Sequence, residues 1–288
     1  MGTLEKEYSK KVSKIKKLEV KTVFQEKEVL RIGFDRVVFK IRIEESFNSE
    51  NPVFQILCVN NSKKEGNLTF NPNRILRGHN VSNATNEEIN ICLDMIKDNI
   101  PNDIIFEIIG GKEIEINFNW LTKSDLKYFK FFYIQFVDIL FKEFNFNLVD
   151  HRINKNNWDI DKNFSSDTES IKVFKMKGKN KLLSLKIYPK SIREEIENLP
   201  KDMILMRMEM TIHSTGIKSY FKANNSIELN KAILNFFEKL GERLFLRLVD
   251  ESTGRVKKSN KYNFPLKEFL EPFEKNVQDL ININKTNS

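Results

Sequence analysis

The stretch Ile204-Leu205-Met206-Arg207-Met208-Glu209-Met210-Thr211-Ile212-His213 alternates between an apolar set of side chains and a mainly polar set. Successive side chains of a β-strand point to opposite faces of the sheet, so the apolar set that begins at Ile204 would face a core. Arg207, Glu209 and His213 would lie on the other face. The stretch therefore predicts a strand that is buried on one face and polar on the other.

Two further stretches show the same alternation. Glu113 and Glu115 oppose apolar residues within 112–119, and Lys186 and Tyr188 do so within 182–188. If these strands neighbour the 204–213 strand, the phenol of Tyr188 and the carboxylates of Glu115 and Glu209 converge on one open sheet face.

The rest of the chain adds strands and amphipathic helices. Strands are predicted at 35–43, 53–59, 68–70 and 170–176, and a turn at 177–180 joins the last of these to 182–188. Helices are predicted from 86 to just before Pro101, from Thr122 to about Phe144, from Asn225 with a break or bend near Gly241, and from Pro265 to about Ile281. Hairpins without a regular βαβ repeat indicate an α+β fold, with a mainly antiparallel central sheet, helices packed on one face and a helical C-terminal region.

Composition limits the classes of protein to consider. Of the 288 residues 40% are hydrophobic, which supports a proper core, and the net charge of +8 comes in lysine-rich blocks that suit a polyanion such as DNA. Many lysine-rich chains are equally basic without binding nucleic acid. No apolar run is long enough to span a bilayer and the N-terminus lacks a signal-peptide stretch, so we expect a cytoplasmic protein with no membrane partner. The two cysteines, Cys58 and Cys92, support neither a disulfide framework nor a zinc site.

A polar block interrupts the pattern of strands and helices. It reads Asn71-Pro72-Asn73-Arg74-Ile75-Leu76-Arg77-Gly78-His79-Asn80-Val81 and combines a turn, two arginines and an imidazole. Arg74 and Arg77 suit phosphate, although a solvated surface is the simpler explanation. His79 has three open roles: it could ligate a metal, contact phosphate, or form a hydrogen bond within its own turn.

This block resembles the NP-x-K/R-x-L-x-GHNV signature of the gene II replication initiators of filamentous bacteriophages and related plasmid rolling-circle replication (Rep) proteins. Three later segments follow in the order of that family. Lys186-Ile187-Tyr188-Pro189-Lys190 is similar to the Y-x-K element, Met206-Arg207-Met208-Glu209-Met210 to the R-x-E strand, and Ile114-Glu115-Ile116-Asn117-Phe118 to the I-D-x-T-F strand with Glu in place of Asp. The similarity extends from about residue 66 to about residue 245.

The resemblance implies a nickase that cuts and rejoins one DNA strand at a phage or plasmid replication origin. Tyr188 would be the nucleophile and Lys190 its basic companion, with a covalent 5′-phosphotyrosine intermediate. Glu115 and Glu209, with His79 as a third candidate, would hold Mg²⁺ or Mn²⁺. The candidate DNA contacts are Arg74, Arg77, His79, Lys186 and Arg207.

The expected domains combine the resemblance with local patterns. The lysine-rich residues 1–24 are expected to form a basic N-terminal arm, residues 25–215 the nickase domain that the resemblance implies, and residues 216–288 the helical C-terminal region. Origin DNA is the expected partner, with a host helicase and polymerase as further candidates.

Other interpretations remain open at the level of sequence. The chain could be a non-catalytic DNA-binding replication or repressor protein on the same scaffold, or a basic globular protein with accidental matches. Tyr188 could be an ordinary strand residue, since strands favour tyrosine, and Glu209 an ordinary surface charge paired with Arg207. Tyr128, Tyr133 and Tyr220 are alternative nucleophiles in principle.

Overall fold

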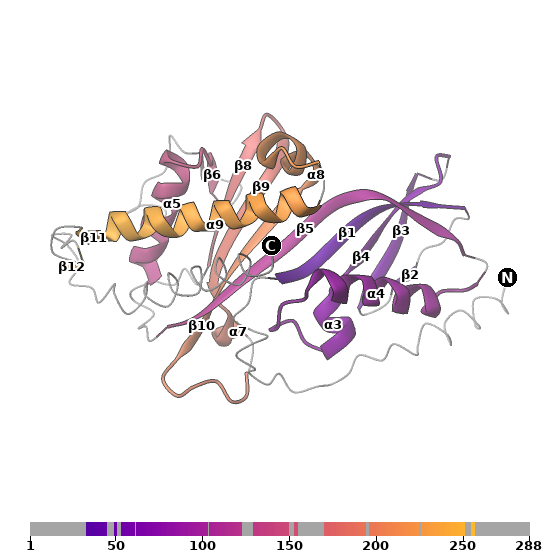
Figure 1. Ribbon diagram of the computed structural model, residues 1–288, viewed down its shortest axis with the longest axis horizontal. Helices are drawn as coiled ribbons and strands as arrows, with labels where there is room; N and C mark the ends of the chain where they lie inside the picture. The colour runs from indigo at the N-terminus through magenta and orange to yellow at the C-terminus, as the bar shows by residue number, and fades with distance from the viewer. Residues whose placement is uncertain are drawn as a thin grey trace. The chain divides into compact units, whose positions relative to one another are not determined.

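A computed structural model describes residues 33–44, 49–50, 53–60, 62–102, 104–122, 129–149, 153–154, 170–193, 196–224, 226–250 and 255–256. The chain divides into two compact units between Asn117 and Phe118. The division falls inside β5 (Phe106–Thr122), so this long strand belongs to the first unit up to Asn117 and to the second from Phe118 onward. Figure 1 gives the order of the elements.

The sheet of the first unit follows the order β2-β3-β4-β1-β5. Its other strands are β1 (Gly33–Ile43), β2 (Ser49–Glu50), β3 (Phe54–Asn60) and β4 (Glu65–Phe70). All four neighbouring pairs are antiparallel. Short connections favour this arrangement for the sequential pairs β2–β3 and β3–β4.

A β-bulge interrupts the pairing of β1 with β5. Phe34 pairs with Ile116 and Arg36 with Glu115, which leaves Asp35 as an extra residue on β1. A bulge breaks strict side-chain alternation and turns a side chain toward a new direction. The bulge therefore brings the side chains of both Arg36 and Asp35 within reach of Glu115.

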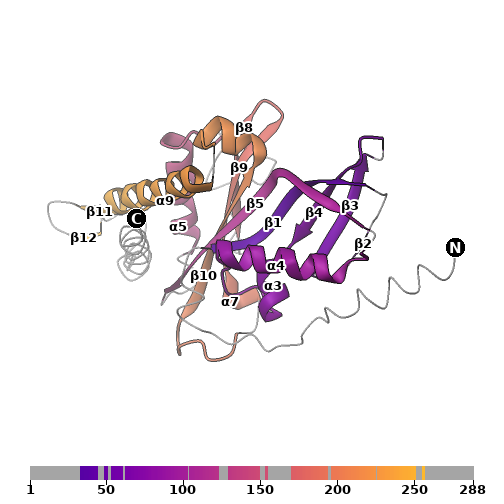
Figure 2. The same cartoon turned by 45° about the vertical axis from the view of Figure 1, so that its right-hand side comes forward.

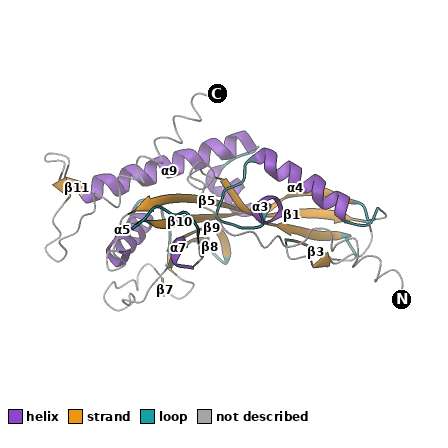
Figure 3. Ribbon diagram, turned by 90° about the horizontal axis from the view of Figure 1, so that it is seen from below, coloured by secondary structure: helices purple, strands orange, loops and turns teal. Residues whose placement is uncertain are grey.

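Two helices cover one face of the first unit's sheet (Figures 2 and 3): α3 (Pro72–Arg77) and α4 (Asn86–Asn99). Thr85 caps α4 in a capping box with Glu88. Ile89, Cys92 and Ile96 of α4 pack in one hydrophobic cluster with the inward residues of the strands. The main members of that cluster on the strands are Val37, Ile41, Ile43, Phe54, Ile56, Leu68 and Phe70.

The sheet of the second unit follows the order β5-β10-β9-β8-β6-β7, with β5 contributing its end from Phe118. Its strands are β6 (Leu148–Val149), β7 (Ile153–Asn154), β8 (Ile171–Lys177), β9 (Asn180–Pro189) and β10 (Ile204–His213). β8 and β9 form the predicted hairpin, whose turn places Gly178 at a positive φ of 59° that suits glycine. The predicted β10 matches the observed strand at both ends.

Helices α5 (Phe129–Lys142) and α9 (Ser226–Leu248) build the core of the second unit. Phe237 of α9 stacks on Phe118 with ring centroids 6.2 Å apart, and Phe236 meets Phe144 edge to face at 5.1 Å. The shorter elements are α7 (Lys190–Arg193), α8 (Ser214–Gly216), the π-helix η3 (Ile217–Phe221), β11 (Val249–Asp250) and β12 (Arg255–Val256).

The architecture confirms an α+β fold with a mainly antiparallel sheet. Two local predictions are wrong, because Thr122 ends β5 instead of capping a helix and residues 72–77 form a helix that was not predicted. Of the break or bend predicted near Gly241, the break is absent, since α9 is one helix from Ser226 to Leu248. The predicted basic arm at 1–24 and helix at 265–281 lie outside the described residues. Among the helices that are described, none is long and apolar enough to cross a membrane.

Candidate functional site

Tyr188 and Glu209 meet on neighbouring strands of the second unit. The register of β9 with β10 pairs Tyr188 with Arg207 and Lys186 with Glu209, so the four side chains share one sheet face. The Tyr188 hydroxyl donates a short hydrogen bond to Oε1 of Glu209. The predicted convergence of the phenol with this carboxylate is therefore present.

Two lysines surround the Tyr188 ring. The ammonium of Lys186 lies 4.3 Å from the ring centroid and 3.8 Å from Oε2 of Glu209, while that of Lys190 lies 5.9 Å from the centroid. Each oxygen of Glu209 thus has its own partner, the phenol on one side and Lys186 on the other. A cation this close to an aromatic ring is attracted to the ring, and the attraction would strengthen if the phenol lost its proton.

The prediction that this face is open is wrong for two of its residues. Tyr188 is 4% exposed and Arg207 is fully buried. Helix α7, which begins at Lys190, packs against β10, and the two lysines lie over the Tyr188 ring. The Glu209 and Lys186 side chains keep 14% and 27% of their surface exposed, and they form the accessible border of the site.

Arg207 is a buried residue that links two strands of the sheet. Its Nε donates to Oδ1 of the buried Asn119 at 2.7 Å, which ties β10 to the end of β5. A guanidinium with no exposed surface does not meet phosphate without rearrangement, so we do not retain Arg207 as a candidate DNA contact.

The other tyrosines are less suited to nucleophilic attack. Tyr133 is fully buried in the core, and burial raises the pKa of Tyr220 to about 12. A phenol that ionises so late is a poor nucleophile near neutral pH. Tyr128 lies outside the described residues.

The first unit carries a separate pair of carboxylates. One oxygen of Asp35 and one of Glu115 lie within 4.8 Å of each other, and Arg36 lies 3.7 Å from Glu115. Asp35 is only 4% exposed. Arg36 also forms a short ion pair with Glu113, the preceding residue on the same face of β5.

The polar block at 71–81 folds as α3 and holds Asp35. Asn71 caps α3 by accepting from the backbone N–H of Arg74, and its amide donates to Oδ1 of Asp35 at 2.7 Å. Asn73, fully buried, donates to the carbonyl of Phe34 at 3.0 Å. Pro72 suits the first helical turn, and Gly78 ends the helix at a φ of 75°. The block therefore fastens α3 to the bulge of β1.

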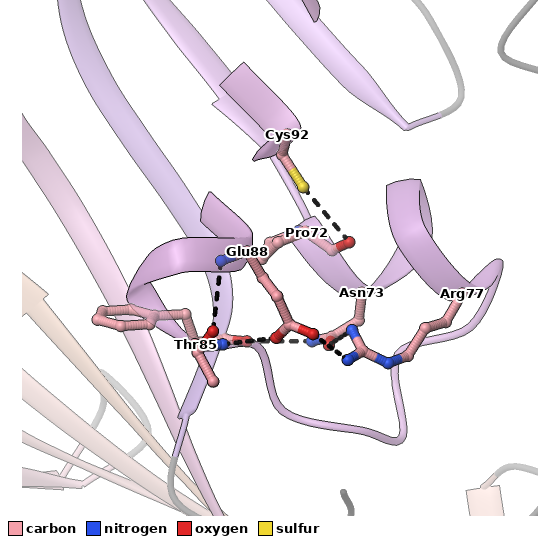
Figure 4. A network of polar contacts seen from close by, with 7 residues as sticks. Pro72, Asn73, Arg77, Thr85, Glu88 and Cys92 are labelled. Carbon is pink, nitrogen blue, oxygen red and sulfur yellow. Dashed lines mark hydrogen bonds and ion pairs between the residues drawn. The ribbon is translucent and has the colours of Figure 1, made fainter. Parts of the chain in front are cut away.

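The basic residues of the block take different positions. Arg74 is exposed, whereas the guanidinium of Arg77 pairs with Glu88 and lies 3.5 Å from Oδ1 of Asn73 (Figure 4). Nδ1 of His79 accepts from the backbone N–H of Val81 at 3.3 Å, which matches the third of its open roles. A DNA or metal contact by His79 or Arg77 stays a prediction.

Asp35 is a site residue that was not predicted from the sequence. Val37 faces the core, and strict alternation would place Asp35, two residues earlier, on the same side of β1. A carboxylate on that side would not be chosen as a candidate for a solvent-facing site. An aspartate on the core side of a predicted strand was the available signal. The bulge that turns Asp35 toward Glu115 depends on the pairing of β1 with β5, which the sequence does not display.

The donors of the first unit fit a hard divalent cation. Asp35 and Glu115 offer carboxylate oxygens, the ligands that Mg²⁺ and Mn²⁺ prefer. Asn117 lies two residues after Glu115 on the same strand face, is fully buried, and neither polar atom of its amide has a hydrogen-bond partner among the described residues. Buried polar groups in that state call for an explanation, and an ion with its hydration shell would supply one.

No protein-family model matches the sequence, and a search of curated proteins finds no significant match. The function of this chain is therefore inferred from these side chains and their geometry.

Proposed function

We propose that this chain is a metal-dependent DNA nickase and strand transferase that starts rolling-circle replication at a phage or plasmid origin. The observation that carries the proposal is the hydrogen bond from the Tyr188 hydroxyl to Glu209, with Lys186 and Lys190 beside the ring. A tyrosine nucleophile needs a base for its proton and positive charge near its oxygen, and this cluster provides both.

The proposed reaction transfers one DNA strand to the protein. The Tyr188 oxygen attacks the phosphorus of a phosphodiester, and its proton passes to Glu209. The bond from phosphorus to the 3′ oxygen breaks, which leaves a 5′-phosphotyrosine, and the departing 3′ oxygen takes up a proton to become a hydroxyl. Rejoining is the reverse, with a 3′-hydroxyl as nucleophile, so the energy of the bond is conserved.

The remaining residues support this step. Lys186 keeps Glu209 oriented toward the phenol, and Lys190 offsets the charge that forms on the phenol oxygen. A divalent cation would withdraw charge from the scissile phosphate when bound. Asp35 and Glu115 are the residues that we propose hold it; the resemblance adds Glu209 as a ligand.

The test uses supercoiled origin DNA with Mg²⁺ or Mn²⁺. Wild-type protein should nick the DNA and form a covalent protein-DNA band that survives denaturation, and Tyr188→Phe should do neither. Tyr220→Phe is the matched control and should behave as wild type. A covalent band from Tyr188→Phe protein would refute the assignment of the nucleophile. Glu209→Gln should lose nicking while it retains DNA binding.

A second candidate function is a non-catalytic DNA-binding replication or repressor protein on this scaffold. The observation that favours it is the low exposure of Tyr188, since a phosphodiester must reach that oxygen. Specific retention of origin DNA without any denaturation-resistant band, across both metals, would establish this alternative.

A further inference from the structure

The turn of the β8–β9 hairpin and the nearby helical residues carry an excess of positive charge. Residues 175–181 contain four lysines and no acid, and residues 214–224, which include α8 and η3, contain two lysines and no acid. Five of these six lysines are exposed, and one of the five, Lys181, lies over the ring of Phe174. The other four, which we term the basic end of the second unit, are Lys177, Lys179, Lys218 and Lys222.

Alpha-helix α8 and η3 lie beside the hairpin (Figures 1 and 2). The Thr215 hydroxyl donates to the carbonyl of Lys181 at 3.1 Å, and the Lys175 ammonium lies 4.6 Å from the centroid of the Tyr220 ring. Lys175 and Tyr220 are each two residues from a member of the basic end. The hairpin and η3 therefore present their exposed lysines next to one shared contact.

Lys175 itself is not part of the basic end, because its ammonium is used inside the unit. It donates to the carbonyl of Phe144 at 2.7 Å and to that of Asn145 at 3.3 Å, just after the end of α5. Burial lowers the pKa of Lys175 accordingly. This lysine holds the hairpin to the end of α5 and is not offered to a ligand.

The four lysines of the basic end are not neutralised by carboxylates of the described residues. Two acids on neighbouring elements have partners of their own. Glu228 accepts from the backbone N–H of Asn224 at 2.8 Å, and Glu143 lies 3.1 Å from Nε of Arg243. The field at this surface is therefore positive, which attracts a polyanion.

Lys222 takes a backbone conformation that lysine rarely adopts. It ends η3 at a φ of 54° and a ψ of 29°, in the left-handed region. Helices commonly end in this conformation on glycine, because a Cβ crowds the backbone there. A lysine at such a position costs stability, and residues that are held in strained conformations cluster at sites that bind ligands.

A double helix of DNA fits these cations better than a single strand does. Proteins that bind single strands offer aromatic rings on which the bases stack, in addition to cations. The exposed large apolar side chains of the described residues are all leucine, isoleucine or valine. Lysine ammonium groups on flexible stems act as point charges, and a duplex offers closely spaced phosphates on two backbones.

We propose that the basic end of the second unit holds duplex DNA by its phosphates, independently of base sequence. This inference rests on the proposed function for its ligand. The hairpin turn and Tyr188 lie near opposite ends of β9, which at 3.3 Å per residue separates them by about 25 Å. That distance corresponds to about seven base pairs, so the basic end would hold the duplex to one side of the nick while Tyr188 acts on one strand.

The experiment measures binding of a short fluorescent duplex of arbitrary sequence to full-length Tyr188→Phe protein over a range of salt concentrations. Adding Lys179→Gln and Lys222→Gly together should reduce the slope of log affinity against log salt by about 1.8, or 0.9 for each lost phosphate contact. At about 0.15 M salt this loss corresponds to binding that is about 30-fold weaker. Lys179→Arg with Lys222→Arg keeps both charges and should bind as the parent does.

Two controls separate local charge from net charge and from folding. Lys40→Gln with Lys97→Gln removes as much charge from the first unit, where Lys40 lies 3.1 Å from Glu65 and Lys97 lies 3.5 Å from Asp94, and should leave the slope unchanged. Lys222→Gly places glycine at the positive φ, so its melting temperature by circular dichroism should be no lower than that of the parent. Weaker binding by that variant is then a loss of charge.

The inference is overturned by an unchanged slope in the glutamine and glycine pair, or by an equal reduction in the Lys40 and Lys97 pair. A reduction seen with a single-stranded oligonucleotide and not with the duplex would overturn it as well. An unchanged slope, with wild-type nicking when the same pair is made in protein that retains Tyr188, would refute the duplex surface and leave the proposed function standing. A reduced slope without any covalent band from wild-type protein would support the surface and refute the nickase.

Discussion

Replacement of Asn71 by alanine tests whether the polar block at 71–81 holds α3 against β1 in the first unit. Asn71→Ala removes the cap of α3 and the amide that donates to Asp35 at 2.7 Å. Loss of a cap costs about 1 kcal/mol. A buried carboxylate left without this donor costs about 1–3 kcal/mol more. We expect α3 to open more easily by about 2–4 kcal/mol, which raises the open population roughly 30-fold to 900-fold.

Cys92 reports that opening. It is fully buried in α4, and its Sγ lies 3.8 Å from the carbonyl of Pro72, the first residue of α3 (Figure 4). In a Cys58→Ser background, the rate at which a thiol reagent modifies Cys92 measures how often α3 leaves its place. Asn71→Ser keeps an acceptor for the cap but is too short to reach Asp35, so its rate should fall between those of wild type and Asn71→Ala.

Asn90→Ala is the control, because Asn90 is an exposed residue of α4. Its rate should match that of wild type. A rate for Asn71→Ala within about threefold of wild type, well under the range derived from the cap and the buried hydrogen bond, would refute the role of this block. Equal rates for Asn71→Ala and Asn90→Ala would refute it as well.

Two further predictions concern buried groups. Arg207→Met should destabilise the second unit by about 2–3 kcal/mol, because Asn119 loses a charged hydrogen bond, while the salt dependence of DNA binding stays that of wild type. Urea unfolding and a salt titration measure the two effects, and a reduced salt slope would restore Arg207 as a phosphate contact. Burial, with a smaller contribution from Glu88, raises the pKa of Cys92 from 9.0 to about 12. The stability that depends on the neutral thiol is complete below pH 9 and lost as the pH rises toward 12, so unfolding free energy should fall over that range in wild type and less in Cys92→Ala. Parallel pH profiles for the two proteins would contradict this.

Local patterns predicted those features that depend on neighbouring residues alone. The alternation within β10 fixed its ends and its two faces, and the turn between β8 and β9 was identified because Gly178 allows a positive φ. The amphipathic pattern that opens at Asn86 marked the start of α4 in the same way, and the structure adds the capping box of Thr85 with Glu88. The same kind of signal misled at Thr122, because a capping motif there lies at the end of a long strand whose pairing the sequence does not display.

The sequence by itself determined the α+β class, the strand faces and the shared face of Tyr188 with Glu209, because side-chain direction along a strand follows from backbone geometry. Tertiary structure decided what covers those faces. Alternation gives the side of a residue but not its neighbours, so it could not predict that Arg207 is buried against Asn119 or that Tyr188 is recessed beneath two lysines. It also could not place Asp35 beside Glu115, since the bulge that turns Asp35 arises only when β1 pairs with a strand about eighty residues away.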